Sequence, residues 1–220
     1  MKLAVFDIDG TLVDSRAIIQ HATEVAFGRM GLAPPAYEQV RKVVGLGLAE
    51  SLNILAPDLD AAGQKELLDH YKILFNALRQ EDDFHEPLYD GAAETLARLE
   101  RDGWRIAMAT GKSRRGVDAI VATHGWETLF HSTHCAEDGP SKPHPAMLRA
   151  AMTALGARPD DTIMIGDSIH DMSMAKAAGV YAQGVSWGFC TRQEVLDSGA
   201  DHCADSFAEL DEALARFGEA

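Results

Sequence analysis

Short apolar runs alternate with amphipathic segments along most of the chain. The apolar runs are bounded by polar or turn-forming residues, as buried strands usually are, and they cover residues 3–6, 104–109, 130–135, 161–165 and 180–185. Patterns with a helical period predict helices at about 90–101, 112–124, 147–155, 168–178 and 204–217. Strands that alternate with helices in this way favour an α/β fold built on a parallel, doubly wound sheet.

Residues 16–82 interrupt this alternation. They contain only helical patterns, which predict helices at about 16–30, 37–44, 49–55 and 65–78. Glycine and proline at positions 31, 34 and 35 separate the first two helices, and the acidic residues 81–83 are typical of a linker. We therefore predict two domains, an α/β core formed by residues 1–15 and 83–220 and an inserted all-helical domain formed by residues 16–82.

A pair of carboxylates follows the first predicted strand directly. If the chain stays extended there, Asp7 and Asp9 point to the same face, and Gly10 then allows a tight turn. Two acids side by side repel one another, so they need a cation or a proton between them. The alternative is a simple turn in which one of the two acids caps the next helix.

Chemically useful residues also follow the other predicted strands. In open α/β sheets, ligands bind outside the carboxyl ends of the strands, so we expect loops at those ends to meet at one site. The residues that these loops carry, besides the first pair, are Thr110, Lys142, Asp167 and Asp171.

The order of these motifs resembles the haloacid dehalogenase superfamily, in its phosphatase branch. The resemblance rests on Asp7-x-Asp9 with the following Gly-Thr-Leu-x-Asp-Ser, the strand ending in Thr110, then Lys142, and the acidic pair Gly166-Asp167. Residues 12–15 and 43–48 resemble most closely the phosphoglycolate phosphatase-like members. The resemblance implies that the helical insert is the cap of the family.

The resemblance implies covalent catalysis by the first motif. Asp7 would be the nucleophile that takes a phosphoryl group, which divides one difficult displacement into two easier ones. Asp9 would protonate the leaving oxygen and later activate water. Since the dehalogenases of the family lack an acid at this second position, Asp9 favours phosphoryl chemistry.

The resemblance also implies which residues would bind the phosphate. Thr110 with the amides of Gly111 and Lys112 would hold phosphate oxygens, although a Thr here can equally be an ordinary helix cap. Lys142 would neutralise Asp7 and the phosphate, although most loop lysines are simply solvated.

A Mg²⁺ site would complete this set. Asp7, the backbone carbonyl of Asp9, and Asp167 would be the ligands, because Mg²⁺ prefers oxygen donors and few carboxylates. Asp171 would lie behind them and hold Lys142 or a metal-bound water.

Substrate selection would come from the cap, because the motifs contact only the phosphate and the metal. Arg41 and Lys42 precede the glycines of residues 45–47, so the two cations could meet a substrate carboxylate while Gly47 allows close approach of the backbone. Alternatively, the glycines only separate two helices and both cations are solvated.

Composition limits the partners. The 220 residues carry a formal net charge of −14, which repels nucleic acid and anionic membranes, and no apolar run could span a bilayer. Three widely spaced cysteines without zinc or redox spacing indicate reduced thiols, and the short apolar start does not resemble a signal peptide. We expect a cytoplasmic monomer or homodimer. His131 and His134 could be a metal pair, but no third ligand stands near them, and we interpret them as ordinary strand residues.

The sequence therefore predicts a Mg²⁺-dependent phosphatase that hydrolyses a small phosphorylated metabolite, a phosphomonoester such as phosphoglycolate or a sugar phosphate. One alternative is a phosphosugar mutase on the same fold, which would transfer the phosphoryl group between hydroxyls. The other is a noncatalytic phosphate-binding or regulatory protein that keeps the fold.

Overall fold

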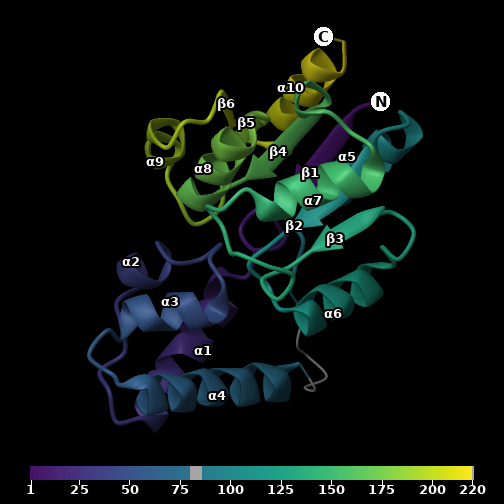
Figure 1. The fold of residues 1–220 in the computed structure, drawn as a ribbon. Coiled ribbons are helices and arrows are strands. Elements are labelled where there is room, and N and C mark those ends of the chain that lie inside the picture. Colours follow the sequence, from purple (N-terminus) through teal and green to yellow (C-terminus); the bar gives the residue numbers. More distant parts are fainter. Residues whose placement is uncertain (80–85, 220) are drawn as a thin grey trace.

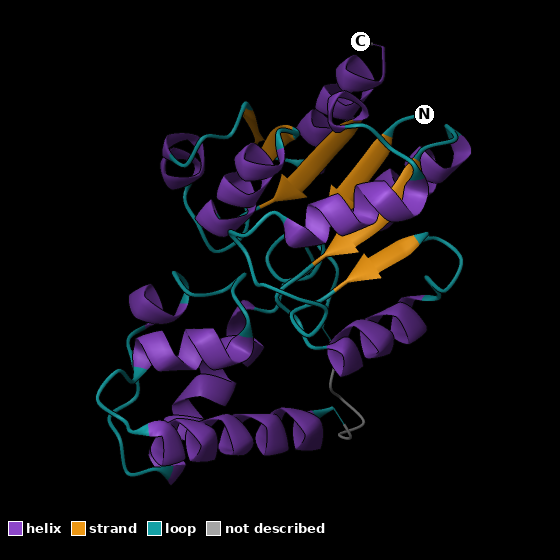
Figure 2. Ribbon diagram, viewed as in Figure 1, coloured by secondary structure: helices purple, strands orange, loops and turns teal. Residues whose placement is uncertain are grey.

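The computed structural model describes residues 1–79 and 86–219, so the predicted acidic linker and the boundary at residue 82 lie outside it. A parallel sheet of six strands forms the centre of the larger part, in the order β3-β2-β1-β4-β5-β6. The strands are β1 (Leu3–Phe6), β2 (Arg105–Ala109), β3 (Ser132–His134), β4 (Thr162–Gly166), β5 (Tyr181–Val185) and β6 (His202–Ala204). Figure 2 shows their arrowheads pointing toward the helical insert.

Helices cover both faces of this sheet, which confirms the predicted α/β class. They are α5 (Ala92–Arg101), α6 (Arg114–His124), α7 (Ala146–Leu155), α8 (Ile169–Ala178), α9 (Arg192–Asp197) and α10 (Phe207–Glu219), with one 3₁₀ turn at Pro159–Asp161. Side chains alternate between the faces of a strand. In β1, Ala4 and Phe6 therefore pack with α5, α6 and α10, whereas Leu3 and Val5 pack with α7 and α8.

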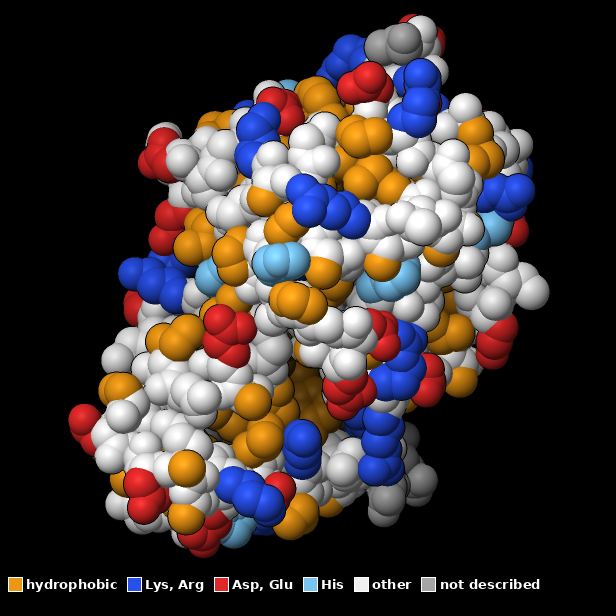
Figure 3. All heavy atoms as spheres, viewed as in Figure 1, with side chains coloured by type: hydrophobic (Ala, Val, Ile, Leu, Met, Phe, Trp, Pro, Cys, Tyr) orange, Lys and Arg blue, Asp and Glu red, His pale blue; other side chains and the backbone are white. Residues whose placement is uncertain are grey.

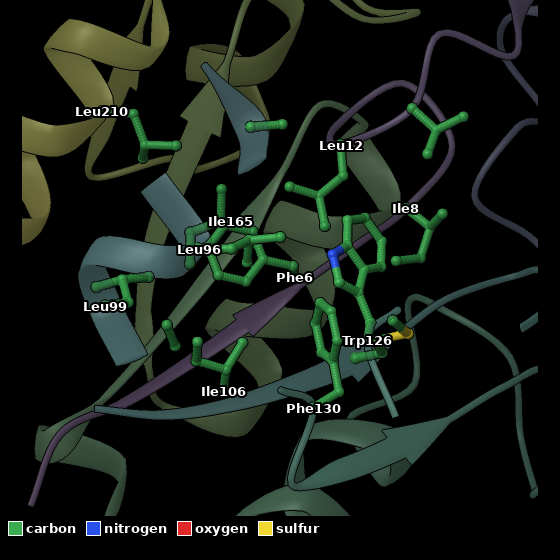
Figure 4. Packing of buried hydrophobic residues seen from close by; sticks show 14 of the residues in the cluster. Phe6, Ile8, Leu12, Leu96, Leu99, Ile106, Trp126, Phe130, Ile165 and Leu210 are labelled. Atoms are coloured by element: carbon green, nitrogen blue, oxygen red, sulfur yellow. The ribbon is translucent and has the colours of Figure 1, made fainter. Parts of the chain in front are cut away.

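The first of these two faces holds the bulky apolar core. Figure 4 shows Phe6 and Ile165 of the central strands among Leu96 of α5 and the rings of Trp126 and Phe130. These side chains are almost completely buried. Such packing fixes the central strands, and with them the loops that leave their carboxyl ends.

The insert consists of four helices with a hydrophobic cluster of their own. They are α1 (Arg16–Arg29), α2 (Tyr37–Val40), α3 (Leu48–Leu55) and α4 (Ala61–Leu78), and Figure 1 shows them gathered beyond the carboxyl ends of the strands. Leu52, Leu67 and Phe27 belong to this cluster, which contains no residue of the sheet. The cluster supports the predicted helical domain, whose boundaries remain a prediction.

The chain enters and leaves the insert through two adjacent segments. Val13 and Leu88 form an antiparallel bridge, and the amide of Asp14 donates to the carbonyl of Pro87 over 2.8 Å. The amide of Tyr89 in turn donates to the Leu12 carbonyl over 3.0 Å. Both connections therefore lie beside the carboxyl end of β1, where the first motif is located.

Some elements differ from the sequence prediction. The predicted helix at 37–44 ends at Val40; residues 41–43 form a turn, and Gly45 after it adopts a φ of 99°. The helix predicted from residue 65 begins at Ala61, since Asp60 caps it by accepting from the amide of Gly63. The segment predicted as one helix from residue 204 is the edge strand β6 followed by α10.

Candidate active site

Three buried acids meet at the carboxyl ends of β1 and β4. The two strands pair in parallel with Phe6 opposite Ile165, so Asp7 and the loop after β4 emerge side by side. Carboxylate oxygens of Asp7, Asp167 and Asp171 lie within 4.8 Å of one another, and the three residues are 1%, 1% and 0% exposed. The predicted convergence of these strand ends is therefore present in the fold.

Lys142 supplies a positive charge to this acidic cluster. Its ammonium is fully buried and lies 3.0 Å from Asp7 Oδ1 and 2.6 Å from Asp171 Oδ1. Burial alone would lower the pKa of Lys142, but Asp171 and Asp7 raise it above the ordinary value. The lysine is consequently cationic at neutral pH, as a group that neutralises the nucleophile and a phosphate has to be.

One lysine does not balance three carboxylates. Burial raises the pKa of Asp7 to about 7, with Lys142 opposing the rise and Asp171 and Asp9 adding to it. Burial, together with Asp171 and Asp7, also raises the pKa of Asp167 well above its ordinary value. A divalent cation would remove this electrostatic strain. The donors are all oxygen atoms, which suits Mg²⁺ better than a soft transition metal.

Two loops hold the Asp167 carboxylate in place. Thr11 donates its hydroxyl to Oδ1 over 2.9 Å, and the amide of Phe189 donates to Oδ2 over 2.7 Å. A Cβ added at Gly10 or at Gly188 would overlap this carboxylate, so both positions need glycine. The sequence analysis missed Thr11 and Phe189, because neither a lone hydroxyl nor a backbone amide gives a signal by itself.

Asp171 is occupied by protein partners on both of its oxygens. Oδ2 accepts from the amide and the hydroxyl of Ser168, over 3.1 and 2.6 Å, and Oδ1 faces Lys142. Asp7 and Asp167 therefore fit a metal better than Asp171 does. This geometry agrees with the predicted role of Asp171 as a residue that holds Lys142, a role that stays a prediction.

A second buried lysine lies at Asp9. Lys112 donates to Asp9 Oδ1 over 2.7 Å and to Glu86 Oε1 over 2.8 Å, and its side chain is 7% exposed. Burial lowers the pKa of Lys112, yet Asp9 and Glu86 raise it above the ordinary value overall. The sequence analysis placed Lys112 at the phosphate and missed Glu86, which lies in the segment that returns from the insert.

Thr110 and Gly111 lie where the phosphate-binding loop was predicted. Thr110 follows β2 directly, is fully buried, and accepts from the Lys112 amide over 3.3 Å. A Cβ at Gly111 would overlap the carbonyls of Gly45 and Leu46, so the loop of the insert packs directly on this turn.

Other contacts fix the same loop of the insert. The amide of Gly47 donates to the hydroxyl of Ser141 over 2.7 Å, next to Lys142 in the chain. Gly47 therefore contacts the core, and its predicted role toward the substrate stays a prediction.

Arg41 contacts carboxylates of the protein itself. Its guanidinium pairs with Glu38 over 2.7 Å and with Glu194 of α9 over 2.9 and 3.0 Å, and it donates to the Phe189 carbonyl over 3.2 Å. Arg41 lowers the pKa of Glu194 to about 2. The carbonyl of Lys42 lies 2.9 Å from His170 Nε2. Neither Arg41 nor Lys42 lines the cavity beside Asp7, so this conformation does not support their predicted contact with substrate.

A cavity of about 140 Å³ separates the insert from the core. Figure 3 shows a hollow with hydrophobic side chains between the two parts of the molecule. At the core end the cavity reaches Asp7, Asp9, Thr110 and Lys112. Three of the predicted catalytic residues, Asp7, Asp9 and Thr110, therefore face the same space.

The remaining candidates do not form a site. His131 Nδ1 accepts from the Ile106 amide over 3.3 Å, and His134 Nε2 lies 2.7 Å from the Ser132 hydroxyl. Within residues 1–79 and 86–219, the group of side chains suited to hold a metal is the acidic cluster. All three cysteines are buried and free. In the same part of the chain, no helix has the length and apolar character needed to cross a membrane.

Comparisons with known proteins show the family to which this chain belongs. A family model described as haloacid dehalogenase-like hydrolase matches residues 1–179. The phosphoglycolate phosphatase of Vibrio parahaemolyticus is 32% identical over 98% of this chain and 96% of its own, and that of Nitrosococcus oceani is 29% identical over 98% and 97%.

Solved structures share the same fold. A predicted phosphatase from Clostridium acetobutylicum has a TM-score of 0.86 at 25% identity, covering 98% of both chains. β-Phosphoglucomutase from Clostridium difficile has a TM-score of 0.83 at 16% identity, covering 100% of this chain and 98% of its own.

Proposed function

We propose that this chain, which belongs to the haloacid dehalogenase-like hydrolases and is a phosphatase, hydrolyses a small phosphomonoester with Mg²⁺ and through a phosphoryl group carried on Asp7. The observation that carries the proposal is the buried Asp7 carboxylate, 3.0 Å from the Lys142 ammonium, at the end of a cavity that also reaches Asp9 and Thr110. A nucleophile, a proton donor and phosphate-binding groups thus surround the space where a phosphoryl group would lie.

In the first step, an oxygen of Asp7 attacks phosphorus, and the bond from phosphorus to the leaving oxygen breaks. Asp9 gives its proton to that oxygen, so the product leaves as a neutral alcohol. Lys142 and Thr110, with the amide of Gly111, stabilise the negative oxygens of the transferring group. Such preorganised positive groups are typically the largest source of rate enhancement.

In the second step, water attacks the same phosphorus atom and the bond to Asp7 breaks. Asp9, now ionised, takes a proton from this water. Lys112 and Glu86 support the step by holding the Asp9 carboxylate in one orientation, since Lys112 contacts both acids. The nucleophile is then restored and phosphate is released.

Mg²⁺ would be held by Asp7, the carbonyl of Asp9, and Asp167. It would neutralise charge on the phosphoryl oxygens during both steps. The raised pKa values of Asp7 and Asp167 support a cation at this place, and Thr11 and Phe189 keep Asp167 oriented toward it.

We also propose that residues 16–82 act as a cap that closes over the core and selects the substrate. The names of the curated relatives make phosphoglycolate the first substrate to test, with sugar phosphates as the second class. A small phosphorylated metabolite remains the proposed partner in either case.

Phosphate release from a panel of phosphorylated metabolites, with Mg²⁺ and in excess chelator, tests the proposal. We expect release that requires Mg²⁺ and that Asp7→Asn abolishes. A mutase would instead return the phosphoryl group to a second hydroxyl of a sugar, and a noncatalytic binding protein would release none. Full activity after verified metal removal would contradict the role of Mg²⁺.

A further inference from the structure

The cavity beside the catalytic groups is apolar on the side of the insert. Its walls there include Val40 of α2 and Val43 just after it, Leu48 and Leu52 of α3, and Tyr71 and Phe75 of α4. The rings of Tyr71 and Phe75 stack with centroids 5.8 Å apart and planes inclined by 17°. Lys72 and Asn76 of α4, and Arg79 after it, also line the cavity. Most of the lining on this side is nevertheless hydrocarbon, and a substrate that extends from the phosphoryl group toward the insert meets mainly apolar side chains.

Two hydroxyl groups of this wall are used within the protein. Thr23 donates its hydroxyl to the Ile19 carbonyl over 2.8 Å, and Ser51 donates to the Val43 carbonyl over 2.9 Å. Their hydroxyl protons are therefore not offered to a ligand. The hydroxyls of a sugar or of glycerol would lose water here without gaining equivalent partners, which costs roughly tenfold or more in binding for each unpaired group.

Two of the three cations that line the cavity are paired within the protein, and the third, Lys72, is exposed to solvent. Lys112 contacts Asp9 and Glu86. The Arg79 guanidinium lies 4.6 Å from the centroid of the Phe75 ring and 3.8 Å from Glu86. A substrate carboxylate that approached either cation would also approach Glu86, and like charges repel.

The volume of the cavity limits how much of a substrate can be buried in it. A cavity of about 140 Å³ holds on the order of ten water-sized groups. The transferred phosphoryl group fills about four of them, which leaves room for roughly five or six non-hydrogen atoms.

We propose that the preferred substrate is the phosphomonoester of a compact apolar alcohol, and not of a hydroxy acid or a polyol. The inference rests on the proposed phosphatase function and narrows its substrate class. The phosphoryl group would lie at Asp7 and Thr110, while the hydrocarbon part would lie between α3 and the rings of α4. Each additional CH₂ buried in the cavity should improve kcat/KM by about fourfold until the space is filled.

A homologous series of substrates tests this. We would measure phosphate release from methyl, ethyl, propyl and butyl phosphate, and from glycerol 1-phosphate and phosphoglycolate, all of which have alkyl leaving groups. We expect kcat/KM to rise along the series and to be at least tenfold higher for butyl phosphate than for the two polar substrates. Equal or faster turnover of phosphoglycolate or glycerol 1-phosphate would overturn the inference and leave the phosphatase function intact.

Two variants of α3 provide a matched pair. Leu48 lines the cavity, whereas Ile54 of the same helix is 54% exposed and does not. Leu48→Asn should reduce the preference for butyl phosphate over glycerol 1-phosphate by about tenfold, and Ile54→Asn should leave it unchanged. The same change in both variants would show that the cavity wall does not select the substrate.

A binding measurement separates failure of this inference from failure of the proposed function. If no phosphate is released even from 4-nitrophenyl phosphate, the phosphatase function fails. Calorimetry with butylphosphonate and with phosphonoacetate, which cannot be hydrolysed in this way, still tests the cavity. Tighter binding of butylphosphonate, by about tenfold or more, supports the apolar class, and tighter binding of phosphonoacetate contradicts it.

Discussion

Two buried lysines reach the active site from different loops, and each ammonium lies between two carboxylates. Lys142 lies 3.0 Å from Asp7 and 2.6 Å from Asp171, and both acids belong to the α/β core. One follows β1 and the other lies in α8. This arrangement is therefore complete without any residue of the insert or of its connections.

Lys112 has similar distances but different surroundings. Its partners are Asp9, at 2.7 Å, and Glu86, at 2.8 Å. Glu86 precedes the bridge between Val13 and Leu88, in the segment by which the chain returns from the insert. The same electrostatic pattern thus serves two purposes. In the proposed mechanism, Lys142 neutralises the nucleophile Asp7, and Lys112 connects the proposed acid Asp9 to the segment that returns from the insert.

The largest effect should follow replacement of Asp7, the proposed nucleophile, which pairs with Lys142. Asp7→Asn should abolish turnover, because an amide cannot form the phosphoryl intermediate. Burial raises the pKa of Asp7 to about 7, so loss of its charge should not destabilise the fold. Phosphate release and the thermal midpoint would be measured together. Substantial remaining activity in a folded variant would contradict the covalent mechanism.

Removal of the first lysine should be almost as damaging. Lys142→Met leaves Asp7 and Asp171 without their buried cation, which typically destabilises a protein by about 3–5 kcal/mol, and activity should fall below detection. The free energies of unfolding of Lys142→Met and Lys112→Met would be measured by chemical denaturation and compared. We expect the smaller loss of stability for Lys112→Met, since Asp9 is 9% exposed whereas Asp7 and Asp171 are almost fully buried.

Asp9→Asn should reduce turnover by about 10²–10⁴, the usual contribution of a positioned acid or base. The phosphorylated form of Asp7 should accumulate if its hydrolysis slows more than its formation. Rapid acid quench with radiolabelled substrate would detect it. An unchanged steady-state rate would remove Asp9 from its proposed role.

A smaller effect should follow loss of the contact between Glu86 and Lys112. Glu86→Gln weakens a charge-assisted hydrogen bond to Lys112, which contributes roughly 1.5 kcal/mol or more, so kcat should fall by about tenfold with little change in KM. Glu127→Gln, at an exposed position, is the control. A fall in stability with no change in kcat would show that Glu86 is only structural.

The smallest effect concerns an ion pair that involves neither Lys142 nor Lys112. Because Arg41 lowers the pKa of Glu194 to about 2, the pair stabilises the fold above the unfolded pKa near 4.5, and this contribution disappears as the pH falls toward 2. Arg41→Gln should therefore cost at most about 1 kcal/mol at pH 7, and the difference from the parent should shrink on acidification. A selective rise in KM for one substrate would instead support the contact with substrate predicted from the sequence.

The sequence predicted the parts of the site that local pattern determines. The acids after β1 and β4 and the threonine after β2 follow short apolar runs directly, and parallel strands align their carboxyl ends. The pairing of Lys142 with Asp171 also agrees with the order of the motifs. These features depend on a few neighbouring residues and on one rule about sheets.

The contacts that sequence reasoning missed depend on tertiary structure. Glu86 meets Lys112 only because the chain returns beside Val13, and Arg41 meets Glu194 across the boundary between insert and core. One helix that was not predicted, α9, does have a signal in the sequence. Thr191 and Glu194 form a capping box at the start of α9, and the spacing Thr-x-x-Glu is a known signal for a helix start.

The adjacent connections of the insert also affect how the chain can fold. Leu3 of β1 pairs with Arg105 of β2, and the whole insert lies between them. Loop-closure entropy grows with the logarithm of loop length. If α1–α4 pack first on their own cluster, they bring Val13 and Leu88 together and shorten the effective loop.

The entropic saving on closing the central strand pair is only on the order of 1 kcal/mol, since closure depends weakly on length. Replacing the insert by a short turn between Val13 and Leu88 should therefore leave a core that still folds, at a similar rate. We therefore expect the insert to be exchangeable without disturbing the assembly of the sheet, because its two ends are already neighbours.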